Sequence, residues 1–323
     1  LPVDVIPAAT LISSLIFLSS VYWFSLRLLA DIKIPISYKV VAASVAVILT
    51  LLWFGVATFS YVRYYAYFAS IFNFCLFFCS VALLLDYLER PRTSNFNLIA
   101  IGVFLVVMRI VHEQEMLFSL VILFGIIIWN FLKKYRSSSL ENLVLRRRAK
   151  SLFATVCIFA PTAICFTFWK RDIGLIAYPH VVDVGAMFSL ERAFPIANPE
   201  LRFWDTLAVY GFVVYVWYFF RYAWFGKISY VVVAMASPLL TLFNPIFVSW
   251  FLHVLPRGGW DVIWRFAYLM PLGIVGSFLL VFSFWNGRNH LAWRRYLLPG
   301  FGAVLLFGAL SPFHTPYLFN NNS

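Results

Sequence analysis

The sequence predicts an all-α fold: a polytopic, integral membrane helical bundle of about ten transmembrane helices, forming one transmembrane domain over residues 1–323. Three observations support this prediction. The 323-residue chain is 63% hydrophobic and only 12% charged, with a mean hydropathy of +0.87. Apolar runs of about 20 residues, the length that crosses a roughly 30 Å hydrocarbon core as a helix, follow one another along the chain. Charged residues are concentrated in the connections between these runs, which leaves no room for a large soluble domain.

Each apolar run that ends at charged or turn-forming residues is expected to be one span. Pro238 and Pro245 interrupt the eighth run, so that span is expected to be kinked or split into two half-helices. The longest connection, residues 170–204, is expected to be an outer loop that lies partly on the membrane. No charged leader precedes the first run, which suggests that a further helix lies before Leu1. The expected spans are 8–29, 38–58, 64–86, 96–111, 115–132, 150–169, 205–221, 228–254, 263–285 and 295–311.

The basic residues predict which side of the membrane each connection faces. Of the 25 Lys and Arg residues, 17 follow the first, third, fifth, seventh and ninth spans, so these connections are expected to be cytoplasmic. Nine of the 13 acidic residues fall on the other side. The net charge of +12 is then explained by insertion topology and anionic lipids, and nucleic acid is not an expected partner. We expect an integral protein of a bacterial inner membrane, with its chemistry on the non-cytoplasmic side.

The stretch "MRIVHEQEMLF", residues 108–118, places Arg109, His112, Glu113 and Glu115 between two apolar runs. A charge held in hydrocarbon costs roughly 2.5–3.5 kcal/mol, so this cluster lies at a water interface or serves a function. One interpretation is a capped helical hairpin, whose polar side chains satisfy the backbone groups at the helix ends. The other is a site, because His together with Glu binds phosphate or sugar hydroxyls and moves protons.

The outer loop contains a further pair of ionisable side chains. His180 and Asp183 are three residues apart, which would place them on one face of a helix. Two ligands are too few to predict a metal site, so none is predicted, and a divalent cation stays open as a cofactor. In the same loop, Arg192 and Arg202 could pair with Glu191 and Glu200 as ordinary solvated partners.

A third polar group surrounds the Gly-Gly turn of "HVLPRGGWDVIWRF", residues 253–266, and contains His253, Arg257, Asp261 and Arg265. The expected span boundary places Arg265 just inside the membrane. The planar guanidinium group suits phosphate, which indicates an anionic lipid headgroup or pyrophosphate as a ligand. Pairing with Asp261, one helical turn earlier, is the alternative.

The order of the spans, together with Asp4 in "LPVDVIP", the "RIVHEQE" turn and "PRGGWDVIWRF", resembles the GT-C class of membrane glycosyltransferases. The resemblance covers residues 1–270, but the usual acidic pair of the first outer loop is reduced to one aspartate. It implies transfer of a sugar from a polyprenyl-phosphate donor to an acceptor outside the cytoplasm. It also implies that Asp4, Glu113 or Glu115 deprotonates the acceptor, and that His112, Arg257 and Arg265 bind the donor phosphate.

Two other classes of function remain open on the sequence. A transporter or channel needs polar groups at mid-membrane, where Asn73, Ser237 and Asn244 are nearly all that the chain offers. A structural or accessory subunit of a membrane complex would use the many aromatic side chains, including 36 Phe, to pack against partner proteins and lipid. The sequence has no Walker loop, dinucleotide fingerprint, HExxH or GxSxG motif, so ATP-driven transport and familiar hydrolase chemistry lack support.

Overall fold

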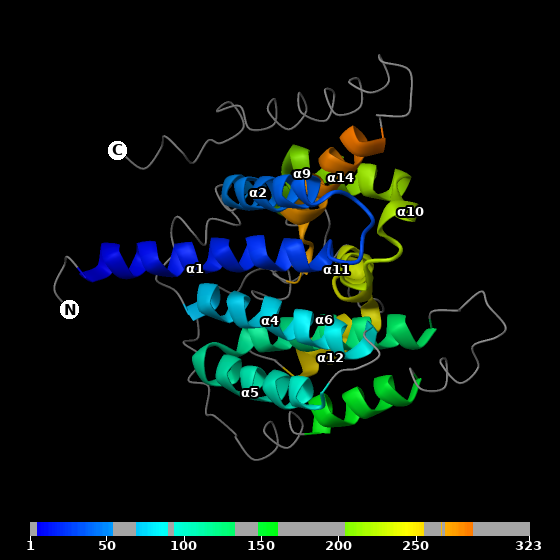
Figure 1. The fold of residues 1–323 in the computed structure, drawn as a ribbon. Helices are drawn as coiled ribbons and strands as arrows, with labels where there is room; N and C mark the ends of the chain where they lie inside the picture. Colours follow the sequence, from blue (N-terminus) through cyan, green and yellow to red (C-terminus); the bar gives the residue numbers. More distant parts are fainter. Residues whose placement is uncertain are drawn as a thin grey trace. The chain divides into compact units, whose positions relative to one another are not determined.

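The computed structural model describes residues 5–53, 69–89, 94–132, 148–160, 204–254, 266 and 269–286 (Figure 1). Regular secondary structure within these ranges is entirely helical. The chain divides into two compact units. The first unit combines Leu1–Cys75, Phe203–Gly226 and Pro271–Ser323, and the second combines Leu76–Arg202 with Lys227–Met270.

The first unit is built around the contact between two helices that lie far apart in the sequence, α2 and α14. Ala42 and Ala46 of α2 are fully buried, and Gly273 and Gly276 of α14 lie close to α2, so little side-chain bulk separates the two backbones. The Ser277 hydroxyl of α14 donates a 2.8 Å hydrogen bond to the Ala42 carbonyl. The helices of this unit are α1 (Val5–Leu28), α2 (Ile36–Trp53), α9 (Trp204–Phe220), α10 (Tyr222–Phe225) and α14 (Leu272–Asn286), and it also holds the beginning of α4 (Ala69–Glu89).

The second unit contains the rest of α4 and four further labelled helices, α5, α6, α11 and α12, with α5 against α6 and α6 against α11 (Figure 1). At one end, the Ser229 hydroxyl donates to Glu89 at 3.0 Å, and Lys150 Nζ donates to the Tyr87 carbonyl at 3.0 Å. The bounds of the helices that follow α4 in this unit are α5 (Phe96–Val111), α6 (Glu113–Leu132), α11 (Ser229–Leu240) and α12 (Pro245–Val254), and a further helix covers residues 148–160.

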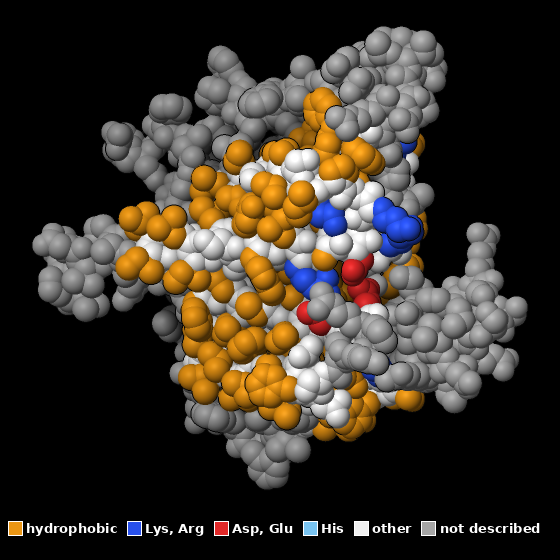
Figure 2. Space-filling model, in the orientation of Figure 1, with side chains coloured by type: hydrophobic (Ala, Val, Ile, Leu, Met, Phe, Trp, Pro, Cys, Tyr) orange, Lys and Arg blue, Asp and Glu red, His pale blue; other side chains and the backbone are white. Residues whose placement is uncertain are grey.

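Three helices of the described chain are long and apolar enough to cross a membrane: Leu11–Leu28, Ile71–Glu89 and Glu115–Leu132. Shorter apolar helices accompany them. Large apolar side chains face outward, among them Phe220 at 82% and Ile246 at 80% exposure, and Figure 2 shows wide apolar areas on the visible face. Such surface is unfavourable in water and is covered by lipid in membrane proteins, so the structure supports membrane association. The ten-span topology stays a prediction.

The interruption expected in the eighth run is present, because α11 ends at Leu240 and α12 begins at Pro245. The Asn244 side chain starts α12 by accepting hydrogen bonds from the backbone N–H groups of Ile246 at 3.0 Å and Phe247 at 3.3 Å. Within the span expected over 263–285, the structure describes the helix α14, which begins at Leu272 directly after Pro271. Proline lacks the N–H that a preceding turn would require, which favours a helix start there. Span 295–311 and all but Trp204 of the expected outer loop lie outside the described residues.

Candidate functional site

The connection between α5 and α6 is a single residue, His112. Its backbone is extended, with φ −163° and ψ 110°, whereas the residues before and after it are helical. The His112 N–H donates a 2.8 Å hydrogen bond to the Met108 carbonyl and so closes the last turn of α5. The chain therefore reverses between two apolar helices with an imidazole at the turn.

The His112 ring is bonded to a buried carboxylate. Its Nδ1 lies 2.5 Å from Oε2 of Glu115, and the exposed fractions of the two side chains are 31% and 1%. With Glu115 ionised, its carboxylate can only accept a hydrogen bond, so in that state Nδ1 donates the proton to Oε2. In the neutral ring of that state, Nε2 is the unprotonated nitrogen. This arrangement can therefore accept a proton at Nε2 of His112, which is the more exposed residue of the pair.

Two buried side chains fix the position of Glu115. The Ser119 hydroxyl, fully buried one turn further along α6, contacts the Glu115 carbonyl at 2.8 Å and the Met108 sulfur at 3.2 Å. Met108, also fully buried, belongs to the last turn of α5. These contacts join the two helices one turn from the pair, and the printed partner of the carboxylate itself is the imidazole.

An aromatic cluster lies one helical turn along α6 from Glu115. The Phe118 ring meets the Phe266 ring edge-on at 4.9 Å between centroids. Phe266 in turn meets Phe247 at 5.2 Å and Phe251 at 5.3 Å, both on α12. The second unit therefore brings α12 and Phe266 to the same end of α6 as the His112–Glu115 pair.

The structure describes three of the predicted site residues fully. Arg109 is half-buried in the last turn of α5, close in sequence to His112, and His112 and Glu115 are paired. Only the backbone is described for Glu113, the first residue of α6, and for His253 in α12. The other candidates lie outside the described residues, and their convergence on this end stays a prediction: Asp4, His180, Asp183, Arg257, Asp261 and Arg265.

The described part of the chain contains no group of three His, Cys, Asp or Glu side chains that could hold a metal ion. Among the described residues, the His112–Glu115 pair has the residue types that suit proton transfer. Sequence reasoning did not identify Ser119, Met108 or the four aromatic residues as parts of this site. One available signal was the spacing of His112 and Glu115, because residues three apart at a helix start can interact in the manner of a capping box.

Comparison with known proteins gives no matching family model, no matching curated protein and no matching solved structure. The functional conclusion therefore depends on the chemistry and position of the site residues.

Proposed function

We propose that the chain is a membrane glycosyltransferase that transfers a sugar from a polyprenyl-phosphate donor to an acceptor hydroxyl on the non-cytoplasmic side. The resemblance of its span order to the GT-C class suggests the substrates. The observation that carries the proposal is the His112–Glu115 pair, a half-exposed imidazole oriented by a buried carboxylate. Its position at the tight turn between two apolar helices supports a role at a membrane surface.

We infer different roles in the proposed reaction for His112 and Glu115. Glu115 is almost fully buried and bonded to Nδ1 of His112, so it is a positioning residue that cannot readily meet an acceptor. We assign the role of base, given by the sequence to Asp4 or a glutamate, to His112. Its Nε2 takes the proton as the acceptor oxygen bonds to the anomeric carbon, and the polyprenyl phosphate leaves with the electron pair of the broken bond. A positioned base contributes about 10²–10⁴-fold in rate.

The departing phosphate needs a positive partner at the same end of the second unit. Arg109, in the last turn of α5, is a candidate. Arg265, which the sequence predicts to bind the donor phosphate, is another candidate, and it lies outside the described residues. Fixed guanidinium donors stabilise the charge that develops on a leaving phosphate, which is the step at which they help most.

A structural subunit is a second candidate, and one specific observation favours it. The His112–Glu115 pair closes within a single hairpin and buries its carboxylate, so it could serve only to tie α5 to α6. Under this alternative the pair supports folding and has no part in turnover.

An assay of sugar transfer separates the two candidates. The purified chain in liposomes would be given radiolabelled polyprenyl-phosphate sugars with glycan, lipid and protein acceptors. Asn at position 112 keeps an N–H near the place of Nδ1 and can still donate to Glu115, but it has no basic nitrogen. We expect His112→Asn to stay folded and to lose about 10²–10⁴-fold in transfer rate.

Glu115→Gln and Glu89→Gln make a matched comparison, because each changes one carboxylate to an amide in the second unit. Glu89 pairs with Ser229 at another site, so its variant should keep wild-type transfer. Glu115→Gln should lose transfer, because it no longer stabilises the charged imidazole. Folded wild-type protein without transfer from any donor, or full transfer by His112→Asn, would support the structural alternative.

A further inference from the structure

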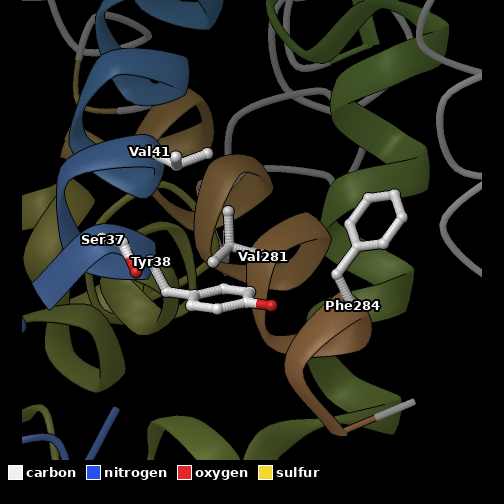
Figure 3. A pocket seen from close by; sticks show the side chains of 5 residues that line it. All are labelled: Ser37, Tyr38, Val41, Val281 and Phe284. Atoms are coloured by element: carbon white, nitrogen blue, oxygen red, sulfur yellow. The ribbon is translucent and has the colours of Figure 1, made fainter. Parts of the chain in front are cut away.

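The first unit contains a groove between the first turns of α2 and the last turns of α14. Its volume is about 310 Å³, and its walls are formed by Ser37, Tyr38, Val41, Val281 and Phe284. Figure 3 shows the Tyr38 ring extending from α2 toward α14, with Phe284 on the far side. Val41 and Phe284 are 51% and 44% exposed, so the groove is open at the surface of the unit.

The lining combines apolar walls with a polar edge. Val41, Val281 and Phe284 offer only hydrocarbon, while Ser37 and Tyr38 each carry a hydroxyl. Trp285, one residue from the end of α14, meets the Tyr38 ring edge-on at 5.1 Å. Tyr and Trp at helix ends are typical of the level where hydrocarbon meets lipid headgroups. The groove therefore suits a ligand that is apolar over most of its length and polar at one end.

The same end of the first unit is basic. Lys33 is exposed four residues before Ser37, and Lys39 directly follows Tyr38 in α2. Lys39 Nζ donates a 2.8 Å hydrogen bond to the Ala30 carbonyl, which leaves two of its three N–H groups for another acceptor. The nearby acid, Asp31, forms an ion pair with Arg27, with 3.8 Å between its Oδ2 and the Arg27 Nη1. The two lysines give the end of the unit where α2 begins a positive charge, which suits an anionic headgroup at that end.

We propose that this groove binds one acyl chain of an anionic phospholipid, with the phosphate held by Lys33 and Lys39. The volume lies at the lower end of the range of about 300–1,000 Å³ for small-molecule pockets, which fits part of one chain better than a whole lipid. The site lies in the first unit, and its assignment does not depend on the proposed transfer reaction.

Photolabelling of the full chain in liposomes tests the position of the acyl chain. The probe is phosphatidylglycerol with a diazirine in one acyl chain, and the label is mapped by mass spectrometry. We expect label on α2 and α14 at the groove. Val41→Trp fills the groove from an exposed position, whereas Val40→Trp makes the same change at the next residue, 39% exposed and not part of the lining. Labelling of α14 should fall at least about tenfold in Val41→Trp, the loss expected when two or more methylenes lose their contacts. It should be unchanged in Val40→Trp.

The same diazirine chain on phosphatidylcholine tests the charge. Phosphatidylglycerol should label the groove about tenfold more strongly at low salt, and Lys33→Gln with Lys39→Gln should remove most of that preference. Equal labelling by the two lipids would overturn the assignment of the headgroup. Equal labelling of α14 in the two tryptophan variants, or no concentration of label at the groove, would overturn the site itself.

Discussion

Replacing Gly273 by Ala should destabilise the first unit, because a Cβ has no room there. It would lie 2.7 Å from Oγ1 of Thr50, 2.9 Å from its backbone nitrogen and 3.1 Å from its Cα. Carbon contacts are most favourable at about 3.5–4.0 Å, and the backbone atoms of α2 cannot rotate away. The two helices would have to separate by roughly 0.5–1 Å, which forfeits a quarter to a half of each contact between them. We expect Gly273→Ala to cost about 1–3 kcal/mol, as overpacked cores do.

Gly102 in α5 provides the matched control. An added Cβ there meets nothing within 4 Å, so Gly102→Ala should be neutral or stabilise by roughly 0.5–1 kcal/mol. Both variants can be unfolded by titrating SDS into mixed micelles, with the fluorescence of the 12 Trp residues as the signal. If Gly273→Ala unfolds at the wild-type SDS fraction, or Gly102→Ala loses as much stability, α2 and α14 do not approach as described.

Two further substitutions address the second unit. His112→Ala should lower the free energy of unfolding by about 3–5 kcal/mol, because it leaves the Glu115 carboxylate buried without its partner. Adding Glu115→Ala should recover part of that loss in a double-mutant cycle, and strictly additive losses would show that the pair is not coupled. Asn244→Ala removes the side chain that caps α12 and should cost about 0.5–2 kcal/mol. Hydrogen exchange at the Ile246 and Phe247 amides should quicken, and unchanged exchange there would contradict the cap.

Much of the helical pattern could be predicted from the sequence. The helices α1, α4 and α6 fall within or close to expected spans, because the thickness of the bilayer sets the length of an apolar run. The break between α11 and α12 could also be predicted, since Pro245, the first residue of α12, cannot supply the N–H group of a continuous helix; Pro238 lies inside α11. The helix α14 lies within the expected span 263–285 and begins directly after Pro271.

The candidate site was predicted only in part. The cluster of ionisable residues identified His112 and Glu115, but their roles depend on which side chain is buried. The Glu115 side chain is 1% exposed beside a hydroxyl, that of Ser119, which joins α6 to Met108 of α5, and the spacing of apolar residues along one helix does not reveal such a contact between helices. The ring contact between Phe118 and Phe266 joins residues far apart in the chain, which a pattern along one segment cannot predict.

The transfer rate per folded molecule, compared between the wild-type chain and His112→Asn, tests the proposed catalytic role most directly. Folded fractions from the SDS titration correct both rates for any difference in stability. The account predicts that the substitution lowers the corrected rate by about 10²–10⁴-fold while the unfolding midpoint changes little. A corrected rate within about twofold of wild type, well below the effect of losing a base, would show that His112 is not the base.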